Sequence, residues 1–242
     1  MSLSLFLIDE LPVTDELVLC GDEGRHAARV QRIGVGDQLL VSDGLGTVLT
    51  CTVAAVRPDG LSLMVQERCS RPAPEPRLVV VQALPKGERA ELAVELLTEL
   101  GVDEIVPWAA SRSIVRWDGP RADRALTKWR RTVREASKQS RRAWVPVVAD
   151  LHPTARVATR LAGATAIVLH EEATAPLPSV PLPATGEVVV VVGPEGGVAP
   201  DELTAFTAAG ATAVRLGEPV LRTSTAGAAA LAALSVRLGR WG

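Results

Sequence analysis

Aromatic residues are scarce in this sequence. Its 242 residues include no Tyr, two Phe and five Trp, although hydrophobic residues make up 47% of the chain. That fraction is ordinary for a soluble globular protein, so we expect a core built almost entirely from aliphatic side chains. The length allows one large domain or two modest ones.

Cysteine is also scarce, and its spacing offers no metal site. Cys20, Cys51 and Cys69 form no Cys-x-x-Cys pair, and three thiols cannot all pair within one chain. This pattern argues against a disulfide framework and against a zinc site. We expect reduced, structural cysteines in a cytoplasmic protein that holds no metal.

The chain lacks long uncharged hydrophobic runs. No basic residue precedes the apolar residues at the N-terminus, and Asp9 and Glu10 follow them, so we expect no signal peptide. The closest candidate for a membrane span, 223–236, is too short and too rich in Gly, Ser and Thr. We therefore expect no membrane partner.

Two common nucleotide-binding motifs are missing as well. No Gly-Lys-Ser/Thr follows a glycine-rich loop, which argues against a Walker-type phosphate loop. The Gly-x-Gly-x-x-Gly spacing is absent, which argues against a nicotinamide-dependent oxidoreductase.

The first 70 residues carry short β-strand patterns with turn signals between them. The predicted strands are 3–8, 38–42, 47–56 and 61–67. Strands this short and this closely spaced predict a small β-barrel domain at 1–70. A helix predicted at 23–33 would place Arg25, Arg29 and Arg32 on one face.

A proline-rich linker at 69–76 is followed by alternating strand and helix patterns, which predict an α/β domain at 77–242. The predicted strands are 78–83, 104–106, 145–148, 166–170, 188–192 and 213–216, and the predicted helices are 88–100, 123–140, 201–209 and 225–238. In the first of these helices Leu92, Leu96 and Leu100 form the predicted buried stripe. We expect a mostly parallel sheet covered on both faces.

Two glycine-rich loops follow predicted strands in the last quarter of the chain. Five consecutive valines at 188–192 are typical of a strand buried on both faces, and Gly193-Pro194-Glu195-Gly196-Gly197 follows directly. A later strand ends at Leu216-Gly217. Ligands of open α/β sheets bind beyond the carboxyl ends of strands, so these loops predict one small-molecule site.

Basic charge is concentrated in one segment. Residues 111–142 include eleven basic and three acidic residues, a net charge of +8, and 23 of the 26 basic residues of the chain are Arg. Such an excess is costly by self-repulsion unless a polyanion answers it, and Arg makes forked contacts to phosphate. The segment predicts nucleic-acid binding, with a solvated face as the alternative. Trp129 is predicted to lie in the core, and Trp117 is a candidate for stacking on a base.

Four stretches together resemble a known family. They are QALPKGER at 82–89, TELGVDEIVP at 98–107, VGPEGG at 192–197 and LGEPVLRTSTA at 216–226. In this order and spacing they resemble the bacterial family that methylates N3 of a uridine in 16S ribosomal RNA, a branch of the SPOUT superfamily. The likeness covers nearly the whole chain. It implies a PUA-like N-terminal domain and a C-terminal α/β domain tied in a deep trefoil knot.

The resemblance also implies a homodimer formed through the knot helix, which is the alanine-rich helix predicted at 225–238. Small side chains let another backbone approach this helix closely, so the helix could equally be the tightest part of the core.

The resemblance implies S-adenosyl-L-methionine as the cofactor, held among three loops. The implied cofactor-binding residues are Leu169, His170, Glu171, Gly193, Pro194, Glu195, Gly196, Leu216, Gly217, Val220, Leu221, Arg222 and Thr223. We predict that Arg222 steadies the anionic O2 or O4 edge of the uridine and that Glu195 is the candidate general base.

The implied partner is 16S rRNA, either free or within the assembled small ribosomal subunit. The predicted RNA-binding residues are Arg25, Arg29, Arg32, Lys86, Arg112, Arg116, Arg134, Lys138 and Arg141. Two alternatives stay open: a related enzyme that acts on a ribose 2′-OH or on tRNA, and a non-catalytic RNA-binding assembly factor. The intact glycine loops and Leu221-Arg222-Thr223 argue against the second.

Three positions depart from the family pattern. Ala199 stands where relatives often have a Ser or Thr that caps the following helix, a loss of about 1 kcal/mol in stability. Ser224 replaces an acidic residue, and Leu5 replaces a basic one. These changes leave the route of the proton and one RNA contact in question.

Overall fold

The computed structural model describes residues 3–241. The chain divides into two compact units, which we call unit 1 (residues 1–73 and 134–145) and unit 2 (residues 74–133 and 146–242). Unit 1 therefore includes a segment that lies far along the chain from its other residues. The two units do not test the predicted domains, so the bounds 1–70 for the PUA-like domain and 77–242 for the α/β domain stay a prediction.

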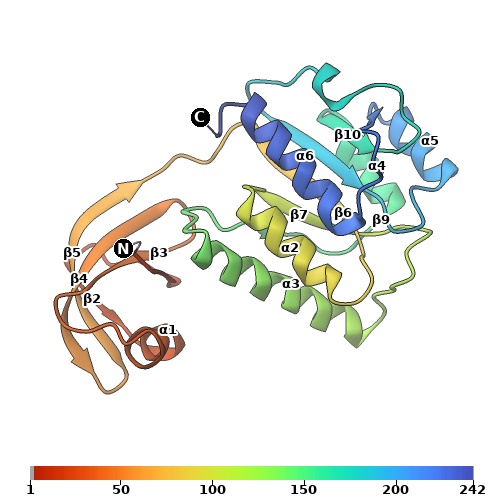
Figure 1. Cartoon of the computed structure of the whole chain (residues 1–242). Coiled ribbons are helices and arrows are strands. Elements are labelled where there is room, and N and C mark those ends of the chain that lie inside the picture. The colour runs from red at the N-terminus through yellow and green to blue at the C-terminus, as the bar shows by residue number, and fades with distance from the viewer. Residues whose placement is uncertain (1–2, 242) are drawn as a thin grey trace. The chain divides into compact units, whose positions relative to one another are not determined.

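Unit 1 is built on a five-stranded sheet in the order β1-β3-β4-β5-β2. Strands β2 to β5 are labelled in Figure 1. The strands are β1 (Leu5–Leu7), β2 (Glu16–Leu19), β3 (Gln38–Ser42), β4 (Thr47–Arg57) and β5 (Gly60–Ser70). Strands β1 and β3 are parallel and the other pairs are antiparallel. Two register shifts between β4 and β5 mark bulges, which bend a sheet around its core. Phe6, Leu39 and Leu63 are among the buried core residues.

The helical segment of unit 1 corrects one prediction. Helix α1 (Gly21–Arg25) continues into a π-helical turn, η1 (His26–Val30), closed by the Gln31 N–H donating to the His26 carbonyl at 3.0 Å. The wider turn adds a residue and ends the helix at Val30. Arg32 lies beyond that end with φ 55°, so the prediction that it shares a helical face with Arg25 and Arg29 is wrong.

Unit 2 is built on a parallel sheet in the order β12-β10-β11-β6-β7-β8, with β9 beside β7. The strands are β6 (Arg77–Ala83), β7 (Glu104–Ala109), β8 (Val147–Val148), β9 (His152–Pro153), β10 (Thr165–Leu169), β11 (Glu187–Val192) and β12 (Thr212–Val214). Because all these pairs are parallel, the carboxyl ends of β10, β11 and β12 meet at one edge of the sheet.

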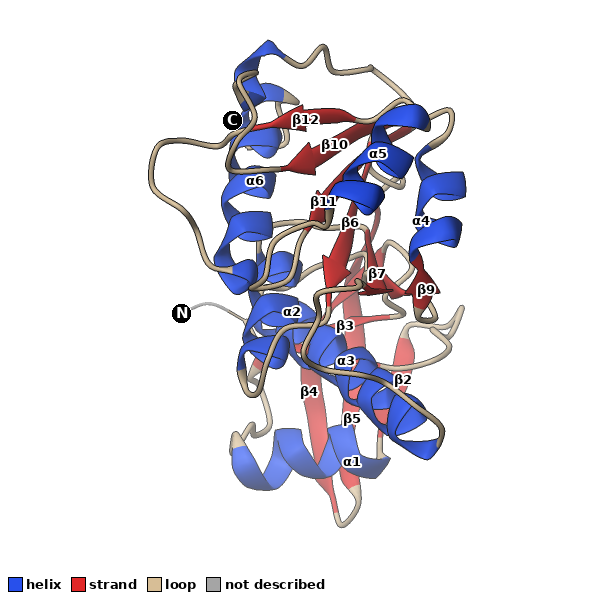
Figure 2. Cartoon of the chain, turned by 90° about the vertical axis from the view of Figure 1, so that its right-hand side faces the viewer, coloured by secondary structure: helices blue, strands red, loops and turns tan. Residues whose placement is uncertain are grey.

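Helices cover both faces of the unit 2 sheet, as predicted (Figure 2). One face carries α2 (Arg89–Glu99) and α6 (Thr223–Arg237), and the other carries α4 (Thr154–Leu161) and α5 (Pro200–Ala208). Helix α3 (Pro120–Gln139) contributes residues 120–133 to unit 2 and residues 134–139 to unit 1. The remaining helix is the short 3-10 turn η2 (Leu177–Ser179).

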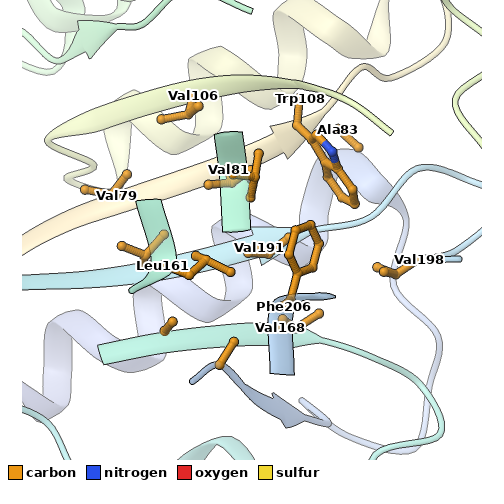
Figure 3. Packing of buried hydrophobic residues seen from close by; sticks show 14 of the residues in the cluster. Val79, Val81, Ala83, Val106, Trp108, Leu161, Val168, Val191, Val198 and Phe206 are labelled. Atoms are coloured by element: carbon orange, nitrogen blue, oxygen red, sulfur yellow. The ribbon is translucent and has the colours of Figure 1, made fainter. Parts of the chain in front are cut away.

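The valine strand is buried on both faces, which confirms the prediction from its unbroken apolar run. Val191 packs in the cluster that includes Trp108 and Phe206, whose rings meet edge to face with centroids 5.2 Å apart (Figure 3). On the opposite face, Val192 lies against α6. A Cβ added to Gly227 would come within 3.2 Å of Val192 Cγ2, so the small residue permits this close approach.

The buried stripe of α2 differs from the prediction. The buried residues are Ala93, Val94, Leu97 and Thr98, whereas Leu92 is 43% exposed. Helix α2 packs against α6, and Leu97 Cδ2 lies 3.0 Å from the position of a Cβ on Gly227. The side of α2 with the smaller residues therefore faces its neighbours, and the predicted leucine stripe is wrong.

The C-terminal segment crosses the sheet. After β12 at one edge, the chain returns to place α6 against α2, β6 and β11. The Arg237 guanidinium then donates to the carbonyls of Leu177 and Val180, at 3.1 and 2.7 Å, and ties the end of α6 to the proline-rich segment after β10. The trefoil knot implied by the resemblance stays a prediction. Between residues 3 and 241 no helix is long and apolar enough to cross a bilayer.

Candidate active site

The loops that leave β10, β11 and β12 line one cavity of about 700 Å³, which we call the strand-end cavity. The segment that leads into α6 completes its wall. All four segments belong to unit 2. The position agrees with the general rule that ligands of open α/β sheets bind at the carboxyl ends of strands.

The thirteen residues implied as cofactor-binding all lie in the wall of this cavity. They are Leu169, His170, Glu171, Gly193, Pro194, Glu195, Gly196, Leu216, Gly217, Val220, Leu221, Arg222 and Thr223. Their individual roles stay predictions. The wall also includes Arg89 and Arg215, which the sequence reasoning did not assign to the site, and Arg112, which it assigned only to RNA.

The glycine loop after β11 folds back on itself, and its geometry requires small residues. A Cβ on Gly193 would lie 2.9 Å from Val198 Cγ2, and one on Gly196 would lie 3.2 Å from Arg112 Cβ. Gly197 has φ 74° and donates its N–H to the Pro194 carbonyl at 2.9 Å. The loop can therefore bring its backbone close to a ligand, as glycine loops do.

Glu195 has a bracing contact within this loop. Its Oε1 accepts the backbone N–H of Lys86 at 3.1 Å, which links the loop after β11 to the loop after β6. This is the only hydrogen bond that the carboxylate makes within residues 3–241, and the side chain is exposed. Oε2 remains available to a ligand.

Arg222 stands at the start of α6. Its carbonyl accepts the N–H groups of Thr225 and Ala226, each at 2.9 Å, so the backbone is fixed by the first helical turn. Its guanidinium is exposed and has no protein partner in the described part of the chain. A fixed backbone with a free guanidinium suits a group that binds an anionic ligand edge.

A buried carboxylate in the first turn of α5, which the sequence did not single out as a site residue, organises the neighbouring loops. Glu202 is 5% exposed, and its Oε1 accepts from the Ser111 N–H at 2.8 Å and the Thr154 hydroxyl at 2.9 Å. Its Oε2 accepts the Ala199 N–H at 3.1 Å. Ala199 cannot cap the helix with its side chain, but its backbone N–H still has a hydrogen-bond acceptor in Glu202. No sequence motif signals the reach from Glu202 to Ser111.

Arg112 follows Ser111 and lies against the glycine loop. Its Nη1 donates to the Gly196 carbonyl at 3.1 Å, and the side chain is exposed. Glu202 thus anchors the backbone of a loop whose next residue presents a guanidinium in the cavity wall.

The nine predicted RNA-binding residues fall into two groups. Seven are exposed: Arg25, Arg29, Arg32, Lys86, Arg112, Arg116 and Arg141. The other two have protein partners that explain them structurally. Arg134 donates to the Leu7 carbonyl at 2.6 Å, and the Lys138 ammonium lies 3.0 Å from both Glu23 and Glu135.

Part of the positive charge of residues 111–142 is neutralised by ion pairs within the protein. Lys128 pairs with Glu91 at 2.8 Å, and Arg130 pairs with Asp150 at 3.1 Å. Arg121, Arg124 and Arg131 are exposed and have no carboxylate partner within residues 3–241. Their spacing of three and seven places them on one side of α3.

The tryptophans of this segment pack together. Trp129 is buried, as predicted, and the half-buried Trp117 meets it edge to face at 5.1 Å. Trp117 is therefore held by the core of unit 2, and its role in base stacking stays a prediction. Within the described residues no group of three His, Cys, Asp or Glu side chains could hold a metal ion.

A parallel α/β unit with a strand-end cavity, joined to a small β-rich unit, defines a two-part protein that binds a small molecule. Two family models match the chain. An RNA methyltransferase domain matches residues 72–235, and an RNA methyltransferase PUA domain matches residues 19–63.

Individual proteins agree with the family models. The chain is 49% identical to "Ribosomal RNA small subunit methyltransferase E" of Mycobacterium bovis, over 98% of this chain and 93% of that protein. It is 30% identical to the Bacillus subtilis protein of the same name, over 94% and 91%. The crystal structure of the Neisseria gonorrhoeae protein bound to S-adenosyl methionine has a TM-score of 0.88 at 26% identity and covers 98% of each chain. The chain therefore belongs to the family of RNA methyltransferases that combine a PUA domain with a methyltransferase domain.

Proposed function

We propose that this protein is an S-adenosyl-L-methionine-dependent methyltransferase that methylates N3 of a specific uridine in 16S rRNA of the small ribosomal subunit. The observation that carries the proposal is the convergence of all thirteen predicted cofactor residues on the strand-end cavity. The 49% identity to a ribosomal RNA small subunit methyltransferase over nearly the whole chain supports the choice of substrate.

The cavity fits the cofactor by size and by chemistry. A volume of about 700 Å³ lies within the range of small-molecule sites. Leu169, Leu216 and Leu221 offer an apolar slot for adenine, and the glycine loop exposes backbone donors and acceptors to the ring edges.

When bound, S-adenosyl-L-methionine would supply an electrophilic methyl group for N3, with its sulfur as the leaving group. The protein must position the uridine in line and deal with the N3 proton, because protonated N3 is a poor nucleophile. We assign the free guanidinium of Arg222 to the anionic O2 or O4 edge. The N3 proton passes to Glu195 Oε2 or, through it, to water. The target base must leave its stack to enter the cavity.

We also assign two parts of the chain to different tasks. Residues 1–70 act as the PUA-like RNA-binding domain, and residues 77–242 form the catalytic domain. The exposed Arg121, Arg124 and Arg131 of α3 present forked donors to phosphates.

A homodimer through α6 completes the proposal. The face of α6 opposite the sheet presents small or apolar residues to solvent, among them Ala229, Ala233 and Val236, and Leu92 of the adjacent α2 is exposed as well. A second copy would bury these side chains. The protein would act in the cytoplasm, where it meets rRNA or the assembled subunit.

Product analysis tests the proposal. Purified protein, methyl-labelled cofactor and 16S rRNA should give labelled RNA, and nuclease digestion followed by mass spectrometry should yield 3-methyluridine. Appearance of a 2′-O-methyl nucleoside, or transfer only to tRNA, would replace the substrate assignment. Calorimetry that detects no binding of S-adenosyl-L-methionine would favour a non-catalytic assembly factor instead.

A further inference from the structure

A second cavity of about 290 Å³ lies wholly within unit 1, and we call it the unit 1 groove. Three segments far apart in sequence line it. They are residues 3–5, the π-helical turn with His26 and Gln31, and the end of α3 with Gln139 and Arg141. The proposed catalytic chemistry uses none of these residues.

The groove combines unpaired polar groups with one arginine that has no carboxylate partner within residues 3–241. The side chains of Gln31, Gln139 and Arg141 are exposed and make no hydrogen bond to protein within residues 3–241. His26 is exposed, and its ring meets that of Phe6 edge to face, with centroids 6.4 Å apart. Lys138 and Glu135 also line the groove, and the Lys138 ammonium is paired with both Glu135 and Glu23. The available cation is therefore Arg141.

Arg141 occupies a backbone conformation that favours glycine. The Arg142 N–H donates to the Ser137 carbonyl at 2.9 Å, and the Arg141 N–H donates to the Lys138 carbonyl at 3.2 Å, which is the Schellman arrangement at a helix C-terminus. The residue at this position, with φ 54°, is usually Gly because an L side chain raises the conformational energy there.

Arg32 is the other non-glycine residue with positive φ within residues 3–241, and it follows Gln31 of the groove. Both outliers are arginines, and both stand at helix ends that border one cavity. Such backbone outliers and π-helical turns concentrate at functional sites. Two independent features of the backbone therefore point to the same place as the side-chain chemistry.

We propose that the unit 1 groove binds one unstacked nucleotide of the RNA, separate from the base that enters the strand-end cavity. Single-stranded RNA is recognised by hydrogen bonds to base edges and by stacking on aromatic or guanidinium planes. Gln31 and Gln139 each carry a donor and an acceptor for a base edge, His26 offers a stacking face, and Arg141 binds the phosphate. An acidic peptide would use the cation but would leave both amides without a role. The inference rests on the proposed action on RNA.

The substitution Arg141→Gly tests this site without endangering the fold, because glycine suits the backbone at position 141 better than arginine does. We expect the melting temperature to stay the same or rise. Fluorescence anisotropy with a 16S rRNA fragment should show affinity lowered about tenfold, the size of one lost arginine contact. The slope of log affinity against log salt should fall by about 0.7. Cofactor affinity, measured by calorimetry, should not change.

A matched control and a second measurement complete the test. Arg57→Ala removes an exposed arginine of the same unit, outside the groove, and should leave RNA affinity unchanged. Photo-crosslinking of 4-thiouridine-containing 16S rRNA should label peptides that contain His26, Gln31 or Gln139.

The possible outcomes distinguish failure of the nucleotide site from failure of the proposed methyltransferase function. Unchanged RNA affinity in Arg141→Gly, or crosslinks that avoid the groove, would overturn the inference. Weaker binding to assembled subunits with unchanged binding to free rRNA would indicate a protein partner and would also overturn it. If the wild type binds RNA through the groove but transfers no methyl group, the proposed function fails while the nucleotide site stands.

Discussion

The strand-end cavity of unit 2 and the groove of unit 1 are constructed in different ways. The cavity takes its shape from the backbone: three parallel strands end at one edge, and Gly193, Gly196 and Gly197 let the following chain fold back. The groove takes its shape from residues 3–5 and from side chains at two helix ends, which lie more than 100 residues apart in the sequence. Backbone defines the first site, and tertiary packing defines the second.

This difference has an energetic consequence. Glycine in the loop of the cavity relieves contacts that a Cβ would make, so geometry and local sequence agree there. At Arg141 local sequence and geometry disagree, because an arginine holds a conformation that glycine prefers. We therefore expect the glycines of the strand-end cavity to tolerate little substitution. In the unit 1 groove, replacing a residue such as Arg141 can raise stability while it weakens binding.

The largest effect is expected in the cavity, at Arg222. Replacing it with Ala removes the donors proposed to steady the uridine anion, so kcat should fall by about 10²–10³. Affinity for S-adenosyl-L-methionine, measured by calorimetry, should change far less. Arg222→Lys keeps the charge but loses the planar fork, and its kcat should lie between the two. Ordinary turnover in Arg222→Ala would show that the cavity works without this guanidinium.

The next effect concerns the support of the cavity, at Glu202. Glu202→Ala leaves the Ser111 and Ala199 N–H groups and the Thr154 hydroxyl without their acceptor, and we expect unfolding free energy to drop by about 2–3 kcal/mol in urea titrations. The KM for rRNA should rise because Arg112 loses the anchor of its loop. Glu202→Gln keeps one acceptor oxygen and should lose about 1 kcal/mol. Equal losses in the two variants would contradict the hydrogen-bond account.

Particular residues show what the sequence could predict. The run 188–192 predicted a strand buried on both faces, and Val191 and Val192 indeed face opposite helical layers. The glycine loops predicted a site at strand ends because parallel topology brings those ends together wherever the strands pair. Local pattern was sufficient for the buried strand and for the position of the cavity.

Other residues depend on partners that no local pattern reveals. Lys138 and Arg134 looked available for RNA, yet Glu23 and the Leu7 carbonyl, more than 100 positions away, bind them. Strand β2 and helix α4 escaped prediction because they are short, and tertiary pairing stabilises such elements more than their own propensity does. The predicted stripe of Leu92, Leu96 and Leu100 was wrong because α2 packs its other side against α6. Leu97 lies at Gly227 of that helix, and Ala93 is buried on the same side of α2.

Smaller effects are expected in the unit 1 groove, where Lys138 and Arg141 should differ in their contributions to stability and to RNA affinity. Lys138→Met should lower the free energy of unfolding by about 1–3 kcal/mol, because Glu23 has one oxygen that is already buried without a partner and would lose its cation. RNA affinity should fall less than in Arg141→Gly. Unfolding curves and anisotropy on both variants check this reciprocal pattern. If Lys138→Met is as stable as the wild type but binds RNA much more weakly, Lys138 contacts RNA and its ion pairs are not its main role.

The smallest effect at neutral pH belongs to Cys51 in the core of unit 1. Burial raises the pKa of its thiol from 9.0 to about 11, against a lowering influence of Arg68. The folded state therefore holds the proton more tightly than the unfolded state, so the contribution to stability is complete below pH 9 and is lost as pH rises toward 11. The difference corresponds to about 2–3 kcal/mol at most. Urea unfolding of the wild type and Cys51→Ala at pH 7 and pH 10 should show a steeper alkaline loss in the wild type. Parallel losses would mean that the alkaline sensitivity of unit 1 arises from groups other than this thiol.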